Sequence, residues 1–436
     1  MEQQRGCAAE RGTPLNWSFL QALLALSAGL VLYTYLGYPL VLVALANVKQ
    51  VAADLRFGLG KRNRRRGRSK TQLPMISLVF AAHNEARVIE QKMRNCQYLD
   101  YPAARLEILV GCDGCTDRTV MLARRVNVAN AHIVEISNRH GKPATLNLLM
   151  PLAQGDIIVL CDCNTMLQPD TLLYMIRHFE DRDVGCVCGE LRLVDRGRKQ
   201  GSESLYWKYE TMLKFLESRL NMLVGANGGL FAIRRELFTP LPPDGIVDDF
   251  LVAMRIRAAG YRVVYDPEAV AVEALADGVG HEFRRRIRIG AGNFHALKYT
   301  WKLLNPAMGW IAFSYWSHKV FRWFVPLALC IAETSAILLA SDVRFAAVAA
   351  VGALIAGLGF AGYRLGLRGV HLVPLTLPYY FLSMNLALLL GFLRFLQRSQ
   401  STVWEPTRRP GFSTIDADPE CALELEAQAH FEGADV

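Results

Sequence analysis

Long and short runs of apolar residues divide the chain into membrane and soluble segments. Four runs have the length and composition of helices that cross a bilayer, and they cover residues 17–48, 321–340, 343–363 and 371–395. The first has no small-residue cleavage site after a short core, so it predicts a retained anchor rather than a removed signal. Residues 70–280 contain no comparable run, which predicts a soluble domain between membrane segments.

Within the soluble stretch, short apolar runs rich in branched side chains alternate with helical patterns. These runs predict strands at residues 75–82, 106–112, 131–136 and 157–161. Residues 184–194 predict a further strand pair, and residues 202–221 predict a helix. The alternation of strands and helices predicts a mainly parallel sheet that is covered on both faces.

The strand predicted at residues 157–161 runs directly into two polar residues, Asp162 and Asn164. In open α/β sheets the ligand crevice lies outside the carboxyl ends of the strands. Residues two apart point the same way, so Asp162 and Asn164 can offer oxygens to one divalent cation that clamps a diphosphate. An Asx turn that closes the strand is the alternative.

Neighbouring strand ends also deliver polar residues. Glu85 follows the first predicted strand, Asp113 ends the second, and Lys142 opens the helix after the third. Asp113 can accept hydrogen bonds from a base, and Lys142 can meet phosphate as a point charge. The alternatives are a plain Asp-Gly turn at Asp113 and a solvated surface lysine at Lys142.

Two further charged segments follow. Asp248 and Asp249 lead into an amphipathic helix that ends at Gly260, where one Asp can act as N-cap while the other takes a proton from an attacking hydroxyl. Residues 281–304 combine four arginines with apolar residues, which predicts an interfacial helix. Its arginines can contact lipid headgroups or close over a diphosphate.

The net charge of +9 is concentrated next to the first apolar run. The basic residues at 61–70 mark the cytoplasmic face and attract anionic lipid. Without interleaved aromatic residues or a recognition helix, they do not favour nucleic acid as a partner. The sequence therefore predicts a multi-pass integral protein of the inner or plasma membrane with a cytoplasmic domain. The acidic residues 416–436 predict disorder.

Two questions stay open at this level. One span before the domain and three after it would place the tail outside, whereas basic residues near the chain end favour the inside; a re-entrant last segment with Pro374 and Pro378 would reconcile them. Among the ten cysteines, only Cys112 and Cys115 have the two-residue gap that is typical of zinc ligands. The other closely spaced cysteines, Cys161 with Cys163 and Cys186 with Cys188, lie in strand-like stretches, where Cys behaves as a small apolar residue.

Several motifs, taken in order, resemble the family 2 glycosyltransferases with a GT-A fold. The motifs are AAHNEARVIE, CDGCTDRT, NRHGKPATLN, LCDCNTML, GANGGLFAIRRELF and VDDFLVAMRIRAAGYRVVYDP, and they cover about residues 73–297. With the flanking spans, the chain is similar to the membrane-embedded cellulose, chitin, hyaluronan and poly-N-acetylglucosamine synthases of this family. The resemblance implies a Rossmann-like α/β GT-A domain inserted between transmembrane helices.

The resemblance also implies a role for each matching residue. Glu85, Asp113 and Lys142 match donor-binding positions, with Asp113 at the uracil. Asp162 matches the first Asp of the metal motif, so that Asp162 and Asn164 would hold Mg²⁺ or Mn²⁺. Asp249 matches the general base, and Arg285 and Arg288 fall where processive members carry Gln-x-x-Arg-Trp.

Three departures from the family pattern are visible. Asn164 replaces an Asp of the metal motif, which reduces the charge at that site while keeping an oxygen ligand. Asp248 replaces the usual Glu before the base. Arg285 and Ile289 stand in place of the Gln and Trp of the last motif, and the loss of that Trp puts processivity in doubt.

The function implied is that of an inverting glycosyltransferase. It would move a hexose or N-acetylhexosamine from a UDP-sugar to a growing polysaccharide, with coupling to export and with accessory export subunits as partners. A non-processive enzyme that adds one sugar to a membrane lipid is the runner-up. A non-enzymatic membrane receptor or scaffold is a third alternative, which the presence of Asp113, Asp162 and Asp249 disfavours.

The expected organisation has six segments. They are an N-terminal tail with the first transmembrane helix (1–52), a basic cytoplasmic linker (53–72), the GT-A domain (73–275), interfacial amphipathic helices (276–320), C-terminal transmembrane helices (321–398) and a tail with an acidic end (399–436).

Overall fold

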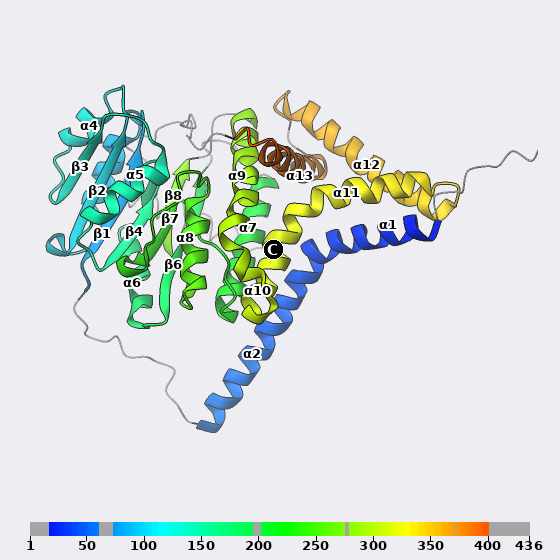
Figure 1. Ribbon diagram of the computed structural model, residues 1–436, viewed down its shortest axis with the longest axis horizontal. Helices are drawn as coiled ribbons and strands as arrows, with labels where there is room; N and C mark the ends of the chain where they lie inside the picture. Colours follow the sequence, from blue (N-terminus) through cyan, green and yellow to red (C-terminus); the bar gives the residue numbers. More distant parts are fainter. Residues whose placement is uncertain (1–16, 61–72, 195–201, 275–278, 371, 401–436) are drawn as a thin grey trace, which may run out of the picture.

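The computed structural model describes residues 17–60, 73–194, 202–274, 279–370 and 372–400. The basic run 61–70 and the acidic residues 416–436 lie outside the described residues. Figure 1 shows a sheet domain on one side and long helices on the other. Between them lie three helices, α7 (Ser202–Leu220), α8 (Asp248–Ala258) and α9 (Val279–Thr300).

Eight strands form one mixed sheet in the order β3-β2-β1-β4-β7-β6-β8-β5. The strands are β1 (Ile76–Ala82), β2 (Leu106–Asp113), β3 (Ala131–Ile136), β4 (Ile157–Cys161), β5 (Thr165–Leu167), β6 (Val184–Val194), β7 (Leu230–Arg234) and β8 (Arg262–Ala274). β1 pairs in parallel with β2 and β4, as do β2 with β3 and β6 with β8. β7 is antiparallel to β4 and β6, and β5 is antiparallel to β8. The predicted mostly parallel Rossmann-like sheet is confirmed.

One strand prediction was wrong. Residues 184–194 form the single strand β6 instead of a strand pair. The glycine in the middle of this stretch, Gly189, does not make a turn; the pairing register with β8 shifts there instead. A Cβ at Gly189 would overlap with the side chain of Leu230 and lie 2.7 Å from the backbone oxygen of Ala269, so the neighbouring strands leave no room for a side chain.

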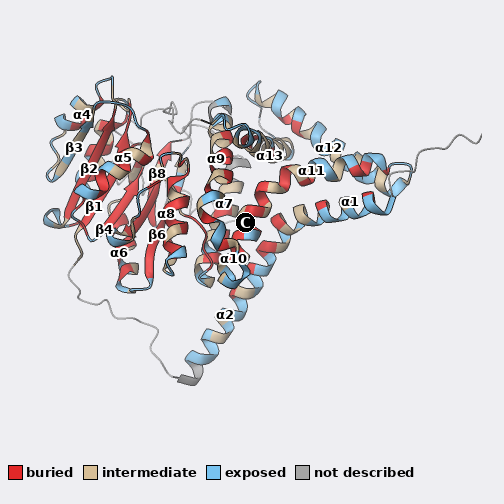
Figure 2. Cartoon of the chain, in the orientation of Figure 1, coloured by how far each residue is buried: buried red, intermediate tan, exposed pale blue. Residues whose placement is uncertain are grey.

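Helices cover both faces of the sheet because successive side chains of a strand point to opposite faces. From β1, Leu78 and Phe80 pack with α3 (Ile89–Gln97) on one face, whereas Val79 faces the other. The face with Val79 also packs against α5 (Lys142–Leu149) and α8. The face with Leu78 and Phe80 also packs against the shorter helices α4 (Thr119–Arg125) and α6 (Thr171–Ile176). The strands β1, β2 and β4 are buried throughout, whereas the edge strand β3 is only partly covered (Figure 2).

Four helices are long and apolar enough to cross a membrane: Trp17–Phe57, Trp310–Leu338, Val343–Gly366 and Val373–Leu396. All four runs predicted from the sequence are found, and the first two differ most from their predicted bounds. In the first, α1 (Trp17–Leu32) continues through a π-helical turn, Tyr33–Gly37, into α2 (Tyr38–Gly60). In the second, α10 (Trp310–Ser314) joins α11 (Phe321–Leu338) through another π-helical turn, Tyr315–Val320.

The surfaces of these helices are apolar where no protein covers them. Leu26, Leu40, Val343 and Phe360 are exposed, and Figure 2 shows long exposed stretches along α1 and α12 (Val343–Gly366), whereas α11 is largely covered by protein. Exposed apolar side chains on a 24-residue helix match the hydrocarbon interior of a bilayer. The last helix, α13 (Val373–Leu396), is continuous although it contains Pro378.

A glycine contact joins α13 to α9, the helix that borders the sheet domain. A Cβ on Gly391 of α13 would lie 2.8 Å from the backbone oxygen of Ile287 and from the backbone nitrogen of Ala291. Small residues let helix backbones approach closely, as in packed membrane helices. The long apolar helix α13 is therefore seated directly on α9, the helix whose arginines border the strand ends described below.

Candidate functional site

The carboxyl ends of β1, β2 and β4 meet at one edge of the sheet because these strands are parallel neighbours. Lys142, the first residue of α5, reaches across this edge and donates a hydrogen bond to Oδ1 of Asp162 at 2.8 Å. The same ammonium lies 3.0 Å from Oδ2 of Asp248, at the start of α8. Three residues that are distant in the sequence thus form one ion-paired cluster.

Asp113 holds the loop that leads to Lys142. Its side chain is fully buried, and its carboxylate accepts backbone N–H groups of His140 at 2.8 Å and Gly141 at 2.7 Å. Gly141 has a φ of +93°, a conformation that other residues rarely adopt. Asp113 therefore positions α5 in this structure, and its contact with a uracil stays a prediction.

Asp248 and Asp249 begin α8, and the cap prediction was wrong. The N-cap residue is Val247, and no side chain caps the helix. Both carboxylates lie in the first turn, where the partial positive charge of a helix N-terminus favours an anion. Burial and the neighbouring Asp248 charge nevertheless raise the pKa of Asp249 to about 6, although Lys142 acts in the opposite direction.

The charge of Lys142 is stabilised by its two partners. Burial disfavours its ammonium form, but Asp162 and Asp248 outweigh that effect and raise the pKa of Lys142. A buried cation between two carboxylates leaves one net negative charge, before Asp249 is counted. This composition suits a site that takes up cations and phosphate together.

The two arginines predicted to bind the donor, Arg285 and Arg288, have different partners. Arg288 turns towards the cluster: burial lowers the pKa of its guanidinium, and Asp248 and Asp162 oppose that shift. Its buried NH1 nitrogen has no hydrogen-bond partner within the part of the chain that the structure describes. Arg285 instead pairs with Glu282 on its own helix at 3.4 Å.

Asp162 and Asn164 are both partly buried and lie on either side of the buried Cys163, so they share one side of the segment after β4. The amide nitrogen of Asn164 donates to Glu273 at 3.3 Å, which leaves its carbonyl oxygen for another partner. No group of three or more His, Cys, Asp or Glu able to hold a metal occurs among the described residues. One carboxylate and one amide oxygen fit Mg²⁺ or Mn²⁺, which complete their shells with water and substrate phosphate.

Glu85, the remaining predicted donor-binding residue, follows β1 at the same edge. Its backbone N–H donates to the hydroxyl of Thr119 at 2.8 Å, which ties the loop after β1 to the helix after β2. Burial raises the pKa of the Cys163 thiol, and the charge of Glu85 adds to that shift, so the carboxylate lies near the segment that carries Asp162. All predicted site residues thus border the same sheet edge, with Arg285 turned towards its own helix.

A family model described as glycosyltransferase like family 2 matches residues 74–292, which is half of the 436 residues. The chain belongs to glycosyltransferase family 2. The match covers the eight strands together with α8 and most of α9.

Similar curated proteins point to the same activity. The glycosyltransferase is 25% identical over 253 residues to a poly-beta-1,6-N-acetyl-D-glucosamine synthase of Staphylococcus aureus, covering 56% of this chain and 60% of that protein. It is 24% identical over 234 residues to the probable glycosyltransferase YdaM of Bacillus subtilis, covering 51% and 56% of the two chains. The chain therefore spans about 60% of the length of the first relatives that it matches.

A solved structure shows the same fold over most of the chain. The mannosyltransferase PcManGT from Pyrobaculum calidifontis, in complex with GDP-Man and Mn²⁺, superposes with a TM-score of 0.66 at 24% identity. The comparison covers 86% of this glycosyltransferase and 99% of that chain. The superposed region includes helices outside the sheet domain, because the sheet domain alone makes up less than 86% of the chain.

Sequence reasoning missed two contacts at the glycosyltransferase site. Glu273 of β8 accepts a hydrogen bond from the Asn164 amide, and Lys214 of α7 donates one to the side chain of Asn227, within the turn that faces Asp249. Lys214 lies on a helix without any of the motifs, and Glu273 lies beyond the last motif, which ends at Pro267. The spacing of Glu210, Lys214 and Glu217 on one face of α7 is a signal that could have pointed to Lys214.

Proposed function

We propose that this glycosyltransferase is an inverting enzyme that transfers a hexose or N-acetylhexosamine from a UDP-sugar to a growing polysaccharide. The observation that carries the proposal is the meeting of Asp162, Lys142 and Asp248 beside Asp249 at the strand ends. Donor groups and a poised carboxylate at one sheet edge are what a single displacement at a sugar carbon needs.

The donor diphosphate would lie between the end of β4 and α9. Asp162 and Asn164 would hold Mg²⁺ or Mn²⁺, and Lys142 and Arg288 supply positive charge from the protein itself. The bound cation would neutralise charge on the departing diphosphate. Arg288 is the stronger candidate of the two arginines, because its buried NH1 nitrogen lacks a partner in the described chain while Arg285 pairs with Glu282.

Asp249 would act as the general base. An acceptor hydroxyl oxygen forms a bond to the anomeric carbon, the bond from that carbon to the diphosphate oxygen breaks, and the hydroxyl proton passes to Asp249. A carboxyl group whose pKa is about 6 is ionised at neutral pH and is a stronger base than an ordinary aspartate. Attack from the face opposite the leaving group inverts the anomeric configuration.

Asp113 and Glu85 would shape the nucleoside pocket. Asp113 does so through the loop that it holds ahead of Lys142, and a carboxylate with two oxygens has further lone pairs for a uracil N–H. The four long apolar helices would place this pocket at the cytoplasmic face and offer a route for polymer export. Membrane lipid would surround their exposed apolar sides.

A second function is favoured by one observation. Arg285 and Ile289 stand where processive relatives carry Gln and Trp, so the acceptor-holding Trp is missing. An enzyme that adds one sugar to a membrane lipid acceptor would not need that residue.

Product size distinguishes the two functions and tests both. Membranes that contain the full chain would be incubated with a panel of labelled UDP-sugars and Mg²⁺ or Mn²⁺, with Asp249→Asn membranes as the control. A polymer ladder supports the polysaccharide synthase, and a single lipid-linked sugar supports the alternative. Absence of both transfer and nucleotide-sugar hydrolysis with every donor would overturn the proposed function.

A further inference from the structure

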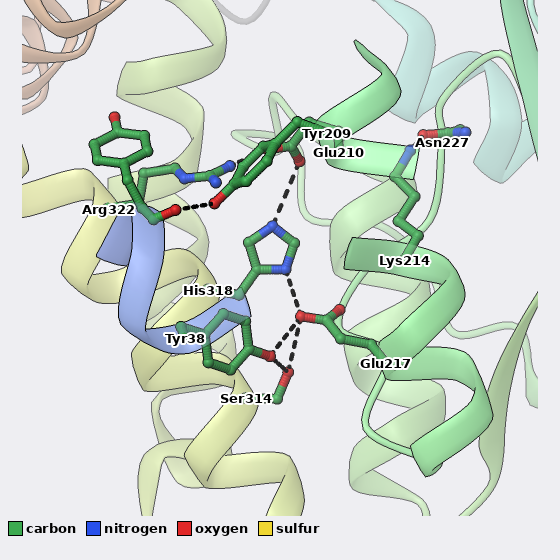
Figure 3. A network of polar contacts seen from close by, with 10 residues as sticks. Tyr38, Tyr209, Glu210, Lys214, Glu217, Asn227, Ser314, His318 and Arg322 are labelled. Carbon is green, nitrogen blue, oxygen red and sulfur yellow. Dashed lines mark hydrogen bonds and ion pairs between the residues drawn. The ribbon is translucent and has the colours of Figure 1, made fainter. Parts of the chain in front are cut away.

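A buried polar cluster joins α7 to the membrane helices, and it lies outside the donor site (Figure 3). Glu217 of α7 accepts hydrogen bonds from the hydroxyl of Tyr38 at 2.6 Å and from the ring of His318 at 2.7 Å. The second ring nitrogen of His318 lies 3.4 Å from Glu210, which also pairs with Arg322. These side chains are almost fully buried, so each depends on its partners for compensation.

The cluster takes its members from three separate segments. Tyr38 belongs to the first membrane helix, His318 and Arg322 belong to the second, and the two glutamates belong to α7. Ser314 of the second helix also belongs to the cluster, because its hydroxyl lies within hydrogen-bond distance of the Tyr38 hydroxyl, at 3.0 Å. Because a buried ion pair that loses one partner is strongly destabilised, α7 is fixed in one position relative to both membrane helices.

The same face of α7 carries Lys214, between the two glutamates. Lys214 donates a hydrogen bond to Oδ1 of Asn227, and Figure 3 shows its side chain extended from α7 towards that residue. Asn227 is held on two more sides: its amide nitrogen donates to the backbone oxygen of Gly189 at 3.0 Å, and its backbone N–H lies 3.2 Å from the sulfur of Cys188.

Asn227 belongs to a glycine-rich turn, residues 225–229, that lies against the proposed general base. A Cβ on Gly228 would be 3.3 Å from Oδ2 of Asp249. At the start of the turn, Gly225 has a φ of +91°, and a Cβ there would lie 2.9 Å from the ring of Phe250. The turn therefore forms one wall of the space around the partly buried Asp249.

We propose that Lys214 is a positioning residue of the transferase. By holding Asn227, it keeps the 225–229 turn against Asp249, and through α7 it makes that turn depend on the seating of the membrane helices. This role rests on the proposed function, in which Asp249 is the general base. Lys214 touches neither the donor cluster nor Asp249; it acts through Asn227.

The proposal predicts a change in the pH profile that a purely structural lysine would not cause. The charged and titratable groups that face Asp249 are Asp248, Lys142, Asp162 and the buried thiols of Cys186 and Cys188. Loosening the turn hydrates Asp249 and removes part of the burial that raises its pKa. The acid limb of kcat/KM should then move to lower pH, by up to about one unit.

The test uses the full chain in detergent or nanodiscs with UDP-N-acetylglucosamine and Mn²⁺, or with whichever UDP-sugar turns over in the panel. The variants are Lys214→Met, Asn227→Ala, the double variant, and the rescue variant Lys214→Arg. The control is Lys208→Met, which removes an exposed lysine from the same helix. Thermal unfolding and gel filtration report whether each variant folds.

Lys214→Met and Asn227→Ala should each lower kcat by roughly 10- to 100-fold, since small misplacements near reacting groups have effects of that order, while KM for the donor stays within about threefold. The kcat of the double variant should lie within about threefold of the kcat of the less active single variant, because both substitutions break the same contact. Lys214→Arg should recover most of the activity, and Lys208→Met should match the wild type.

Three results would overturn the positioning role: wild-type kcat in Lys214→Met, an unmoved acid limb, or losses that multiply in the double variant. If Lys214→Met does not fold, Asn227→Ala and Lys214→Arg decide by the same criteria. Loss of activity in Asp249→Asn with wild-type behaviour in Lys214→Met overturns only the positioning role. Wild-type turnover in Asp249→Asn overturns the proposed base instead, and the reason for this role with it.

Discussion

Replacing the proposed general base should make the protein more stable while it removes activity. Burial and the Asp248 charge raise the pKa of Asp249 from 3.8 to about 6 in the folded protein. The folded state therefore binds the proton more tightly than the unfolded state. Stability falls as the pH rises from about 4 to about 6, and stays lower above that range.

The size of this loss follows from the shift. A difference of about 2 pKa units, at 1.36 kcal/mol each, sets an upper limit of about 3 kcal/mol at neutral pH, because the partly exposed Asp249 keeps part of its hydration. Asp249→Asn keeps the shape of the side chain and cannot ionise, so it avoids this cost. We expect its midpoint of thermal unfolding in detergent at pH 7.5 to exceed that of the wild type by a few degrees, and the difference to vanish near pH 4.

Activity should change in the opposite direction. Loss of general-base help is expected to lower kcat by about 10²- to 10⁴-fold, with little change in the binding of UDP measured by titration. Scanning fluorimetry between pH 4 and 8 and turnover assays on the same preparations measure both effects.

Asp244→Asn supplies a matched control with the opposite sign. Although burial opposes it, a hydrogen bond from Tyr299 and the nearby His295 lower the pKa of Asp244. That variant should therefore lose stability at pH 7.5, and the loss should shrink as the pH falls through the lowered pKa. If the unfolding midpoint of Asp249→Asn is no higher than that of the wild type at pH 7.5, the explanation by a raised pKa of Asp249 is refuted. A difference in midpoint that does not depend on pH would refute it as well.

Three further predictions concern the donor site and its support. Asp162→Ala should abolish the dependence on Mn²⁺ and raise KM for the donor at least about tenfold, and an unchanged metal titration would argue against its role as ligand. Arg288→Ala should weaken UDP binding by roughly 10- to 100-fold, as expected for one charge-assisted contact, whereas Arg285→Ala should change it less than about threefold; equal effects would contradict their different placement. Gly391→Leu should separate α13 from α9 and destabilise the protein by about 1–3 kcal/mol, and an unchanged unfolding midpoint would show that the close approach is unimportant.

The sheet edge could be predicted from the sequence because it depends on local signals. The strands that end near Asp113 and Asp162 are short runs of branched apolar residues, and each is followed at once by polar residues. Parallel neighbours then bring those ends together without any further information. The same logic located Lys142 at the start of a helix.

Other strands could not be predicted, for identifiable reasons. β8 contains Asp266, Pro267 and Glu268 in its middle, which have the composition of a turn, yet the strand continues through them. β7 is only five residues long and follows a glycine-rich turn. In β6, the stretch predicted as a strand pair forms one strand, in which Gly189 allows the close approach of Leu230.

The proposed link from the long apolar helices to Asp249 depends on contacts between segments far apart in the chain. Tyr38 and Glu217 are 179 residues apart, and Glu210 and Arg322 are 112 apart. One signal was available: His318 and Arg322 lie one helical turn apart next to a strongly apolar run, where ionisable residues usually have a specific partner. Their partners could not be identified without the fold.

The most direct test of the central claim is an experimental structure of the full chain with UDP and Mn²⁺ in a lipid nanodisc. The account predicts a metal ion at Asp162 and Asn164, with the diphosphate beside Lys142 and Arg288, and an open space for the sugar facing Asp249. A nucleotide bound elsewhere, with Asp162 and Asp249 far from it, would contradict the proposed active site.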